Sequence, residues 1–435
     1  MLPQKQITHT KSTQLKANKK HTVLSLFSGC GGMDLGFEGG FIIHRQSVNE
    51  KIHSDFISEY LANDFVRLKE TSFQTVFSND ILPEARAAWI YNFSKLGYDA
   101  VNIFHPESIV DLVKAHWETG DIFPKDIDIV TGGFPCQDFS VAGKRKGFDS
   151  KKDHKGNQRT NDEPSEENRG RLYFWMKQVI DIVKPKIFVA ENVKGLTNLG
   201  DVKDIIRNDF SSADENGYIV LNPQVLHAAD YGVPQSRERV IFIGIRKNCL
   251  TAKARHYLSQ ENIPSEYNPY PPITHNYHNG DCELTQYQTV RNVFAHLVEP
   301  QMSADLSQKF YSHAKYMGKH CQGQSEVDLD GIGPTIRSEH HGNIEFRRLS
   351  TEHNGKYIEE LKKGLPERRL TPRECAMIQT FPPDFEFVLN KTQLQPLAVS
   401  TSGAYKIVGN AVPPMLAYNI ARRIESIWNL YFNQE

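Results

Sequence analysis

The stretch TVLSLFSGCGG, residues 22–32, decides the fold class. Its first part is a short, mostly apolar run that is typical of a buried strand, and the glycines behind it let the backbone approach a ligand at the start of a helix. Similar runs recur at 74–78, 127–131, 187–190 and 240–245, with helical patterns at 83–96 and 172–183. This alternation predicts an α/β fold with a doubly wound sheet of parallel strands.

The composition excludes several classes of protein. The chain has 435 residues, of which 39% are hydrophobic and 24% charged, as in a globular protein of two or three domains. No run approaches the roughly 18 apolar residues of a membrane span, and no apolar core follows the basic N-terminus. The six cysteines form no CxxC pair, and the histidines fit no zinc spacing, so we expect a cytoplasmic protein without disulfides or metal.

The order of segments predicts a large and a small domain. Residues 1–21 are a basic tail, and 22–250 form the large domain. Residues 255–365 are loop-rich and form the small domain, 366–400 lead back, and 401–435 complete the large domain with an amphipathic helix. Two polar insertions interrupt the large domain. Residues 44–71 are expected to loop out, and 144–171 to be either a disordered loop or a mobile lid.

An acid near the glycine turn indicates a cofactor site. Asp80 ends the predicted strand at 74–78, where a carboxylate can accept hydrogen bonds from ribose hydroxyls. The turn lacks the spaced third glycine of the dinucleotide fingerprint. This pattern favours a mononucleoside-type cofactor over a nicotinamide dinucleotide.

Candidate catalytic residues follow or precede three other predicted strands. Cys136 comes after 127–131, Glu191 after 187–190, and Arg237 and Arg239 before 240–245. Carboxyl ends of parallel strands meet at one edge, where α/β folds place their chemistry. Arg237 and Arg239, two apart on an extended segment, are expected to point the same way. Local sequence leaves two interpretations of Cys136 open, a nucleophile or a buried structural cysteine.

Together these blocks make the chain recognisable. It resembles the DNA (cytosine-5)-methyltransferase family in its bacterial restriction–modification form, in blocks at 27–32, 133–140, 191–193, 235–240, 369–376 and 404–413. The ordered combination of PCQ, ENV and QSRER is highly specific. The resemblance implies a Rossmann-like S-adenosylmethionine-dependent methyltransferase sheet. Residues 255–365 lie outside the pattern, as expected of that family's target-recognition domain.

The resemblance also implies roles by position. Cys136 is implied as the nucleophile and Glu191 as the group at N3 of cytosine, and Arg239 holds the base with Arg237 beside it. The S-adenosyl-L-methionine pocket is implied at Phe27, Ser28, Gly29, Gly31, Gly32, Leu35, Asp80, Ile81, Pro135, Leu172, Asn410 and Ala411. DNA contacts are expected from Gln137, Ser140, Lys144, Arg145, Lys146, Gln235, Arg337, Arg347 and Arg348. The family's acid at the adenine amino group has no clear counterpart, and the best candidate segment is 106–109.

The implied activity is methylation of carbon 5 of cytosine in double-stranded DNA through a Cys136 adduct on a flipped-out base, which protects host DNA from a cognate endonuclease. A monomer without a protein partner is expected. Three alternatives stay open at this point. They are tRNA as the substrate of the same chemistry, a nicotinamide-dependent oxidoreductase on the same fold, and a catalytically silent DNA-binding protein.

Overall fold

The structure is a computed structural model that describes residues 20–135, 172–198, 200–277, 283–318, 324–338, 344–392 and 397–433. The basic tail up to residue 19, the candidate nucleophile Cys136 and the whole insertion at 144–171 lie outside these residues. Within the described part of the chain, no helix has the length and apolar character needed to cross a membrane.

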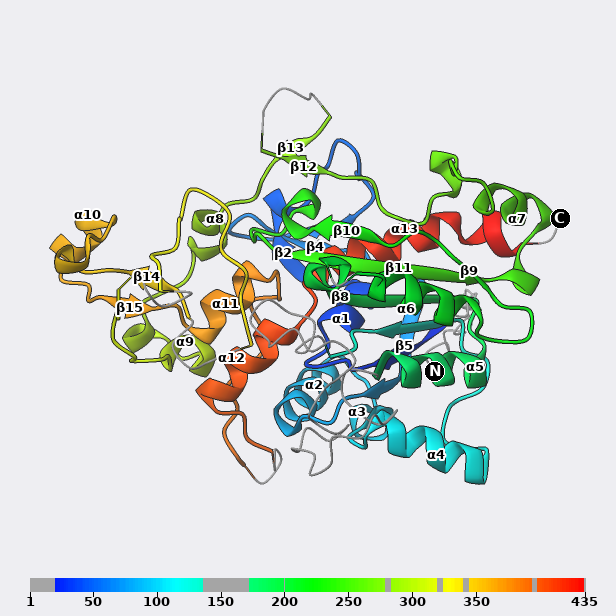
Figure 1. Cartoon of the computed structure of the whole chain (residues 1–435). Helices are drawn as coiled ribbons and strands as arrows, with labels where there is room; N and C mark the ends of the chain where they lie inside the picture. The colour runs from blue at the N-terminus through cyan, green and yellow to red at the C-terminus, as the bar shows by residue number, and fades with distance from the viewer. Residues whose placement is uncertain are drawn as a thin grey trace, which may run out of the picture.

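An eight-stranded mixed sheet forms the centre of the large lobe (Figure 1). Its order is β10-β11-β8-β7-β1-β5-β6, and β9 also pairs with β11. The strands are β1 (His21–Leu26), β5 (Phe73–Asn79), β6 (Phe104–His105), β7 (Ile129–Gly132), β8 (Ile187–Val193), β9 (Tyr218–Val220), β10 (Gln224–His227) and β11 (Glu238–Arg246). The predicted α/β fold is therefore confirmed.

One strand direction was predicted wrongly. The five neighbouring strands β8, β7, β1, β5 and β6 are parallel to one another, as expected. In contrast, β11 runs antiparallel to its neighbours β8, β9 and β10. Only residues 228–237 separate β10 from β11, and a parallel pair needs a longer crossover. The sequence does not reveal this direction, because β11 is buried along most of its length and reads as a continuous apolar run.

Helices cover both faces of the sheet. Alternate residues of a strand enter different core clusters, as Val23 and Leu24 do. The Val23 cluster receives α1 (Gly32–Glu38), α2 (Pro83–Lys95) and α13 (Pro414–Phe432), and the Leu24 cluster receives α4 (Ile109–Thr119), α5 (Leu172–Val183) and α6 (Val202–Ser211). The short α3 (Ala100–Ile103) precedes β6, and α7 (Ala252–Leu258) follows β11.

The C-terminal helix joins the two ends of the large lobe. The buried face of α13 carries the predicted apolar residues, including Met415, Ile420 and Ile424. Gly36 of α1 lies so close to Pro414 and Ala417 that a side chain there would collide with them. At the other end of α13, the rings of His21 and Trp428 lie 4.0 Å apart. The helix thus packs against the first strand and the first helix of the sheet.

The first insertion is more regular than expected. It contains most of a small antiparallel sheet in the order β2-β4-β3. The strands are β2 (Ile42–His44), β3 (Ile57–Tyr60) and β4 (Phe65–Leu68). Every second residue of β4 is buried, which is the pattern of a strand with one face on a core. The Nδ2 of Asn49 donates to the carbonyls of Thr274 and Glu283 at 2.8 and 2.7 Å, so the insertion supports the segment that leads into the small lobe.

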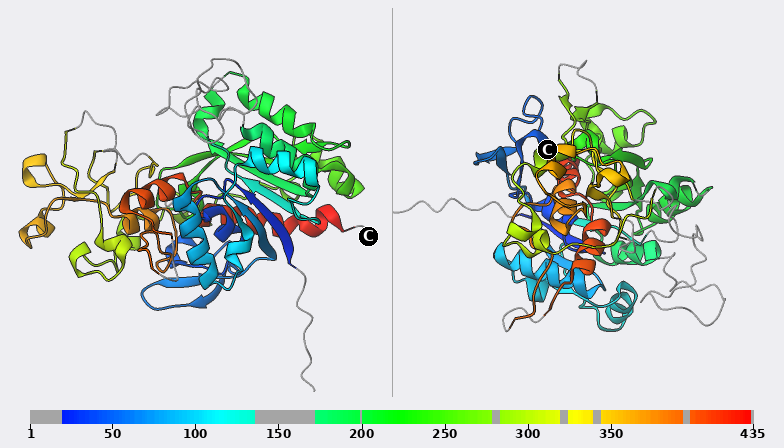
Figure 2. Two further views of the ribbon diagram at one scale, coloured as in Figure 1. Left: turned by 90° about the horizontal axis from the view of Figure 1, so that it is seen from below. Right: turned by 90° about the vertical axis from the view of Figure 1, so that its left-hand side faces the viewer.

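The small lobe lies on the left in Figure 1 and projects from the large lobe in Figure 2. We define it by α8 (Val290–Phe294), α9 (Leu306–Lys309), β14 (Phe346–Arg348), α10 (Ile358–Lys362), β15 (Arg368–Arg369) and α11 (Pro372–Ile378). The helix α12 (Thr401–Asn410) lies between the lobes and packs against both α11 and α2. The two-stranded pair β12 (His275–Asn276) and β13 (Thr285–Gln286) precedes it.

The first residues of the expected small domain pack on the large lobe instead. The amide of Thr251 donates to the carbonyl of Tyr431 at 2.8 Å, and the Nε of Arg423 donates to the carbonyl of Asn268 at 2.8 Å. The hydroxyl of Tyr270 also reaches the carbonyl of Ile241 in β11 at 2.9 Å. Residues 251–270 are therefore tied to α13 and β11, whereas α11, expected in the connection at 366–400, lies in the small lobe.

A buried acid on α1 predicts that stability depends on pH. Burial raises the pKa of Glu38 to about 7, although Tyr98 and the amide of Thr75 donate hydrogen bonds to it. The folded state thus holds the proton more tightly than the unfolded chain, so this contribution is full at low pH and is lost as the pH rises towards 7. The wild-type free energy of unfolding should therefore fall by up to about 3 kcal/mol as Glu38 ionises, since a pKa difference of one corresponds to about 1.4 kcal/mol. In Glu38→Gln, which has no proton to lose, we expect this fall to be absent.

The measurement is urea unfolding of both proteins between pH 5 and pH 8. The variant retains some slope, because burial also raises the pKa of Asp34 to about 6. Glu118→Gln, at an exposed position of α4, is the control and should leave the pH profile unchanged. Parallel profiles for wild type and Glu38→Gln would contradict the assignment.

Candidate active site

The strand order creates a crevice at one edge of the sheet. From β1 the chain continues to β5 and β6 on one side, and β7 and β8 lie on the other side of β1. Ligands of open α/β sheets bind outside the carboxyl ends of the strands at such a switch point. The residues at this edge are therefore the turn after β1, Asp80 after β5, the turn after β7 and the end of β8.

The turn after β1 has a backbone that is open towards this edge. Phe27, Gly29 and Gly31 all have positive φ, of 52°, 57° and 91°. The amide of Ser28 donates to the carbonyl of Asn79 at 2.9 Å, which fixes the turn to the end of β5. A Cβ at Gly29 would meet no atom within 4 Å, so a ligand can approach the backbone there.

Asp80 and Ile81 present complementary surfaces beside the turn. The carboxylate of Asp80 accepts the amide of Gly29 at 2.9 Å and that of Leu82 at 2.8 Å, and burial raises its pKa. The side chain of Ile81 is 40% exposed. An oriented acid beside an exposed apolar side chain suits a nucleoside, whose sugar has hydroxyls and whose base has apolar faces.

Other expected cofactor residues surround the turn. Gly32 lies against Ala411 and the carbonyl of Val412, so the segment after α12 closes on the start of α1. Asn410, at the end of α12, is exposed. Leu172 is buried in the core cluster against which Phe27 packs, whereas Leu35 is buried in the other cluster. The structure therefore brings Gly32 and Ala411 together, but Leu35 packs in the core of α1.

Glu191 and Arg239 form an ion pair at the same edge. The antiparallel register sets Arg239 opposite Val193 and Ile241 opposite Glu191, so the two charged residues are diagonal neighbours on one face. The Nε of Arg239 lies 2.6 Å from Oε1 of Glu191, and both side chains are largely buried. The other carboxylate oxygen lies beside Gly133, where a Cβ would approach it to 3.0 Å. The pair thus adjoins the turn that leads from β7 to Pro135.

Gln235 and Arg237 do not share this position, which corrects the expectation that Arg237 points the same way as Arg239. Both are buried, at 0% and 1% exposure. Arg237 donates to the carbonyls of Ile336, Gly409 and Ala411, and Gln235 accepts the amide of Ile336. The alternation rule fails for Arg237 because this residue precedes β11, where the backbone is not yet paired with β8.

Two expected DNA-reading arginines are held in ion pairs, and one of them is fully buried, which corrects their assignment as exposed readers. Arg348 has no exposed surface and pairs with Glu299 at 2.6 Å and Glu360 at 2.7 Å. Arg347 pairs with Glu360 at 2.9 Å, while Arg337 is partly exposed. The acids that bind these arginines are distant in sequence, so no local signal revealed them.

Several expected residues lie outside the described part of the chain. They are Cys136, Gln137, Ser140, Lys144, Arg145 and Lys146. In the segment proposed for the missing adenine acid, the hydroxyl of Ser108 accepts the amide of Val110 at the start of α4, and Glu107 is exposed. Among the described residues, no group of three or more His, Cys, Asp or Glu side chains is placed to hold a metal ion.

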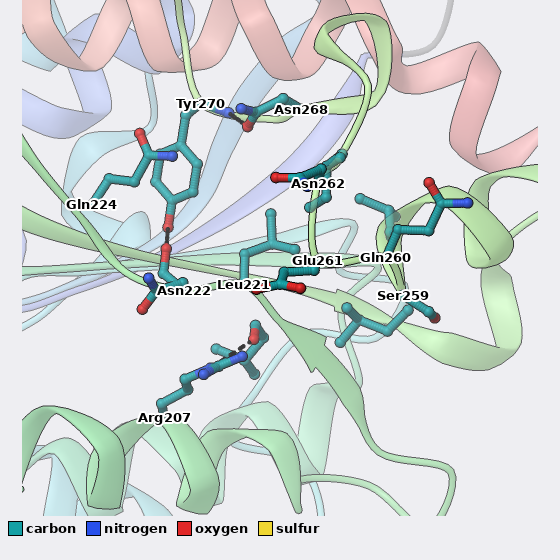
Figure 3. Close-up of a pocket in the computed structure, with 14 residues that line it drawn as sticks. Arg207, Leu221, Asn222, Gln224, Ser259, Gln260, Glu261, Asn262, Asn268 and Tyr270 are labelled. Carbon is teal, nitrogen blue, oxygen red and sulfur yellow. Dashed lines mark hydrogen bonds between the residues drawn. The ribbon is translucent and has the colours of Figure 1, made fainter.

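A large cavity of about 870 Å³ lies elsewhere, beside β9, β10 and α7 (Figure 3). Its walls include the side chains of Arg207 and Tyr270. Tyr270 donates to the carbonyls of Asn222 and Ile241, and Arg207 to that of Val220. These bonds satisfy the backbone where the edge of the sheet is interrupted between β9 and β10. Because the cavity contains none of the expected site residues, we do not assign the chemistry to it.

Comparison with known proteins identifies a family whose pattern this chain matches. The pattern of the family described as C-5 cytosine-specific DNA methylase matches residues 21–426. The chain is 31% identical over 418 residues to the Type II methyltransferase M.BsuRI of Bacillus subtilis, covering 93% of this chain and 79% of that protein. It is also 31% identical to M.BspRI of Lysinibacillus sphaericus, covering 93% and 81%.

A solved structure supports the fold. A mutant of DNMT2 from Spodoptera frugiperda superimposes with a TM-score of 0.53 and 18% sequence identity, covering 94% of this chain and all of that one. At this identity the likeness concerns the fold alone.

The two glycines of the first turn should respond differently to substitution. Gly29→Ala meets open space and should cost about 1 kcal/mol for a left-handed alanine. Gly31→Ala would bring a Cβ within 2.5 Å of Phe93 and 2.8 Å of Trp89 at a φ of 91°, and should cost roughly 3 kcal/mol or more. Urea unfolding of the matched pair measures both losses, and equal losses would contradict this description of the turn.

Proposed function

The chain belongs to the C-5 cytosine-specific DNA methylase family, and on that premise we propose that it methylates carbon 5 of one cytosine in a short duplex site and so protects host DNA from a cognate restriction endonuclease. The observation that best supports this proposal is that three structural features lie together at one edge of the sheet. They are the open turn beside Asp80, the turn that leads through Pro135 to Cys136, and the Glu191–Arg239 pair.

The residues around the first turn fit S-adenosyl-L-methionine. Asp80 would accept hydrogen bonds from the ribose, Ile81 would cover one face of the adenine, and the open backbone at Gly29 would leave room for the amino acid portion. When bound, this cofactor supplies an electrophilic methyl group on a sulfonium. The contact of Gly32 with Ala411 supports the expectation that 410–411 close the site.

The chemistry requires activation of the cytosine ring, because carbon 5 is a poor nucleophile in the aromatic base. We assign the attack on carbon 6 to the thiolate of Cys136, which forms a carbon–sulfur bond and makes an enamine whose carbon 5 is electron-rich. Cys136 directly follows Pro135 in the sequence, and Gly133, earlier in the same turn, lies beside the carboxylate of Glu191 that pairs with Arg239. A guanidinium near the thiol favours its ionised form.

Glu191 and Arg239 are assigned to the pyrimidine itself. The carboxyl group of Glu191 would hydrogen-bond the N3 side of the ring, where charge develops during attack, and Arg239 would orient that carboxyl group and hold the base. After methyl transfer, loss of the carbon 5 proton to a base and departure of the thiolate restore the aromatic ring.

In a stacked duplex, the target cytosine cannot reach the largely buried side chains of Glu191 and Arg239. The target base must therefore rotate out of the helix, at a cost of a few kcal/mol. We propose that Lys144, Arg145 and Lys146, which follow Cys136 closely in the sequence, contact phosphates during this step.

The nucleophile assignment predicts a separation of binding from turnover. Cys136→Ala should abolish methyl transfer while S-adenosylhomocysteine still binds with wild-type affinity, because a thiol-to-methyl change removes the bond-forming atom and little volume. The assays are tritiated methyl transfer and calorimetry. Cys249→Ala is the matched control, at a partly exposed position just after β11 ends, where β11 lies beside the start of β8 and not beside Glu191. Full turnover by the Cys136 variant would refute the mechanism.

The substrate assignment predicts which nucleic acid is modified. Plasmid DNA from a host that expresses the chain should carry methylcytosine at one short motif in bisulfite sequencing. Purified tRNA offered in a parallel methyl-transfer assay should stay unlabelled. Unmodified plasmid together with labelled tRNA would shift the proposal to an RNA substrate.

A further inference from the structure

Three segments of the chain meet at the guanidinium of Arg237. Its Nη1 donates to the carbonyl of Ile336 at 2.9 Å, and its Nη2 donates to those of Gly409 and Ala411 at 3.0 and 2.8 Å. Ile336 lies in the small lobe, between α9 and β14. Gly409 and Ala411 flank the proposed cofactor residue Asn410, and Arg237 lies two residues before Arg239. One side chain therefore bonds to both lobes.

The backbone around this contact is paired as tightly. The amide of Gly333 donates to Pro234 and that of Ser236 to Gly333, both at 2.8 Å. Gly409 packs directly on the backbone of Arg337, where a Cβ would collide. We call the segments 234–237, 333–337 and 409–411 the joint. Because its parts are in contact, a shift of one displaces the others.

We propose that Arg237 is a positioning residue that fixes the cofactor-closing segment 409–411 relative to Arg239 and to the small lobe. The inference rests on the proposed function for the identity of the cofactor. A planar guanidinium can serve carbonyls in two directions at once from a fixed fork, whereas a lysine is a single point charge. The joint thus depends on the shape of the arginine as well as its charge.

The chain offers a matched comparison in Arg369. This arginine is equally buried and donates to the carbonyls of Ala314, Ile344 and Lys315, all within or beside the small lobe. Arg369→Lys disturbs a carbonyl-binding arginine of the same kind without touching the cofactor side. It separates the specific role of Arg237 from the general cost of altering a buried arginine.

The experiment measures S-adenosylhomocysteine binding by calorimetry in wild type, Arg237→Lys, Arg239→Lys and Arg369→Lys. We expect the dissociation constant to rise about tenfold or more in Arg237→Lys, since a charged hydrogen bond to Gly409 or Ala411 is lost. Arg239→Lys and Arg369→Lys should stay within about twofold of wild type. Saturating cofactor should partly restore turnover in Arg237→Lys but not in Arg239→Lys.

A second measurement needs no variant and so remains decisive if Arg237→Lys fails to fold. Hydrogen exchange of the wild-type chain should slow in peptides covering 233–239 and 333–338 when S-adenosylhomocysteine is added, as well as in those covering 27–32. Protection confined to 27–32, or wild-type affinity in a folded Arg237→Lys, would overturn the inference. Absence of any binding to the wild type would instead overturn the proposed function.

Discussion

The register between β8 and β11 is the constraint on which the candidate site depends. Because side chains alternate between the faces of a sheet, a shift of one residue would move Arg239 to the opposite face from Glu191. The same register fixes where residues 234–237 leave the sheet, and therefore where Arg237 meets the small lobe. The antiparallel direction is equally necessary, since it brings the first residues of β11 to the edge where β8 ends.

Buried arginines organise the remainder of the molecule by two different means. Arg237 and Arg369 bond to backbone carbonyls, whereas Arg348 and Arg368 share the carboxylate of Glu299. A buried ion pair adds little net stability but is costly to break on one side, so such pairs resist alternative packings of the loops they connect. In a lobe with few and short regular elements, these contacts replace the ladders that a larger sheet would provide.

The local sequence pattern predicted which segments form strands and helices. It could not predict the contacts between segments that are distant in the sequence. The strands at 127–131 and 187–190 and the helix at 172–183 could be predicted because apolar period and breakers act over a few residues. The direction of β11 and the burial of Gln235, Arg237 and Arg348 could not, because each depends on partners tens to hundreds of residues away. The small sheet of the first insertion was missed because its strands are short and β3 is largely exposed, so no apolar run marks it. The assignment of Cys136 stays a prediction, while the ion pair of Glu191 with Arg239 adds a contact that sequence alone did not contain.

The packing of α13 on α1 and β1 has a consequence for synthesis. A nascent chain that has reached residue 413 possesses every strand of the main sheet, yet one face of the half that contains β1 and α1 is still bare, with Gly36 and His21 lacking their neighbours from α13. The core of that half therefore cannot close before residues 414–432 have been made, because α13 supplies neighbours to both the first strand and the first helix. Fragments that stop before residue 414 leave this apolar face open to aggregation.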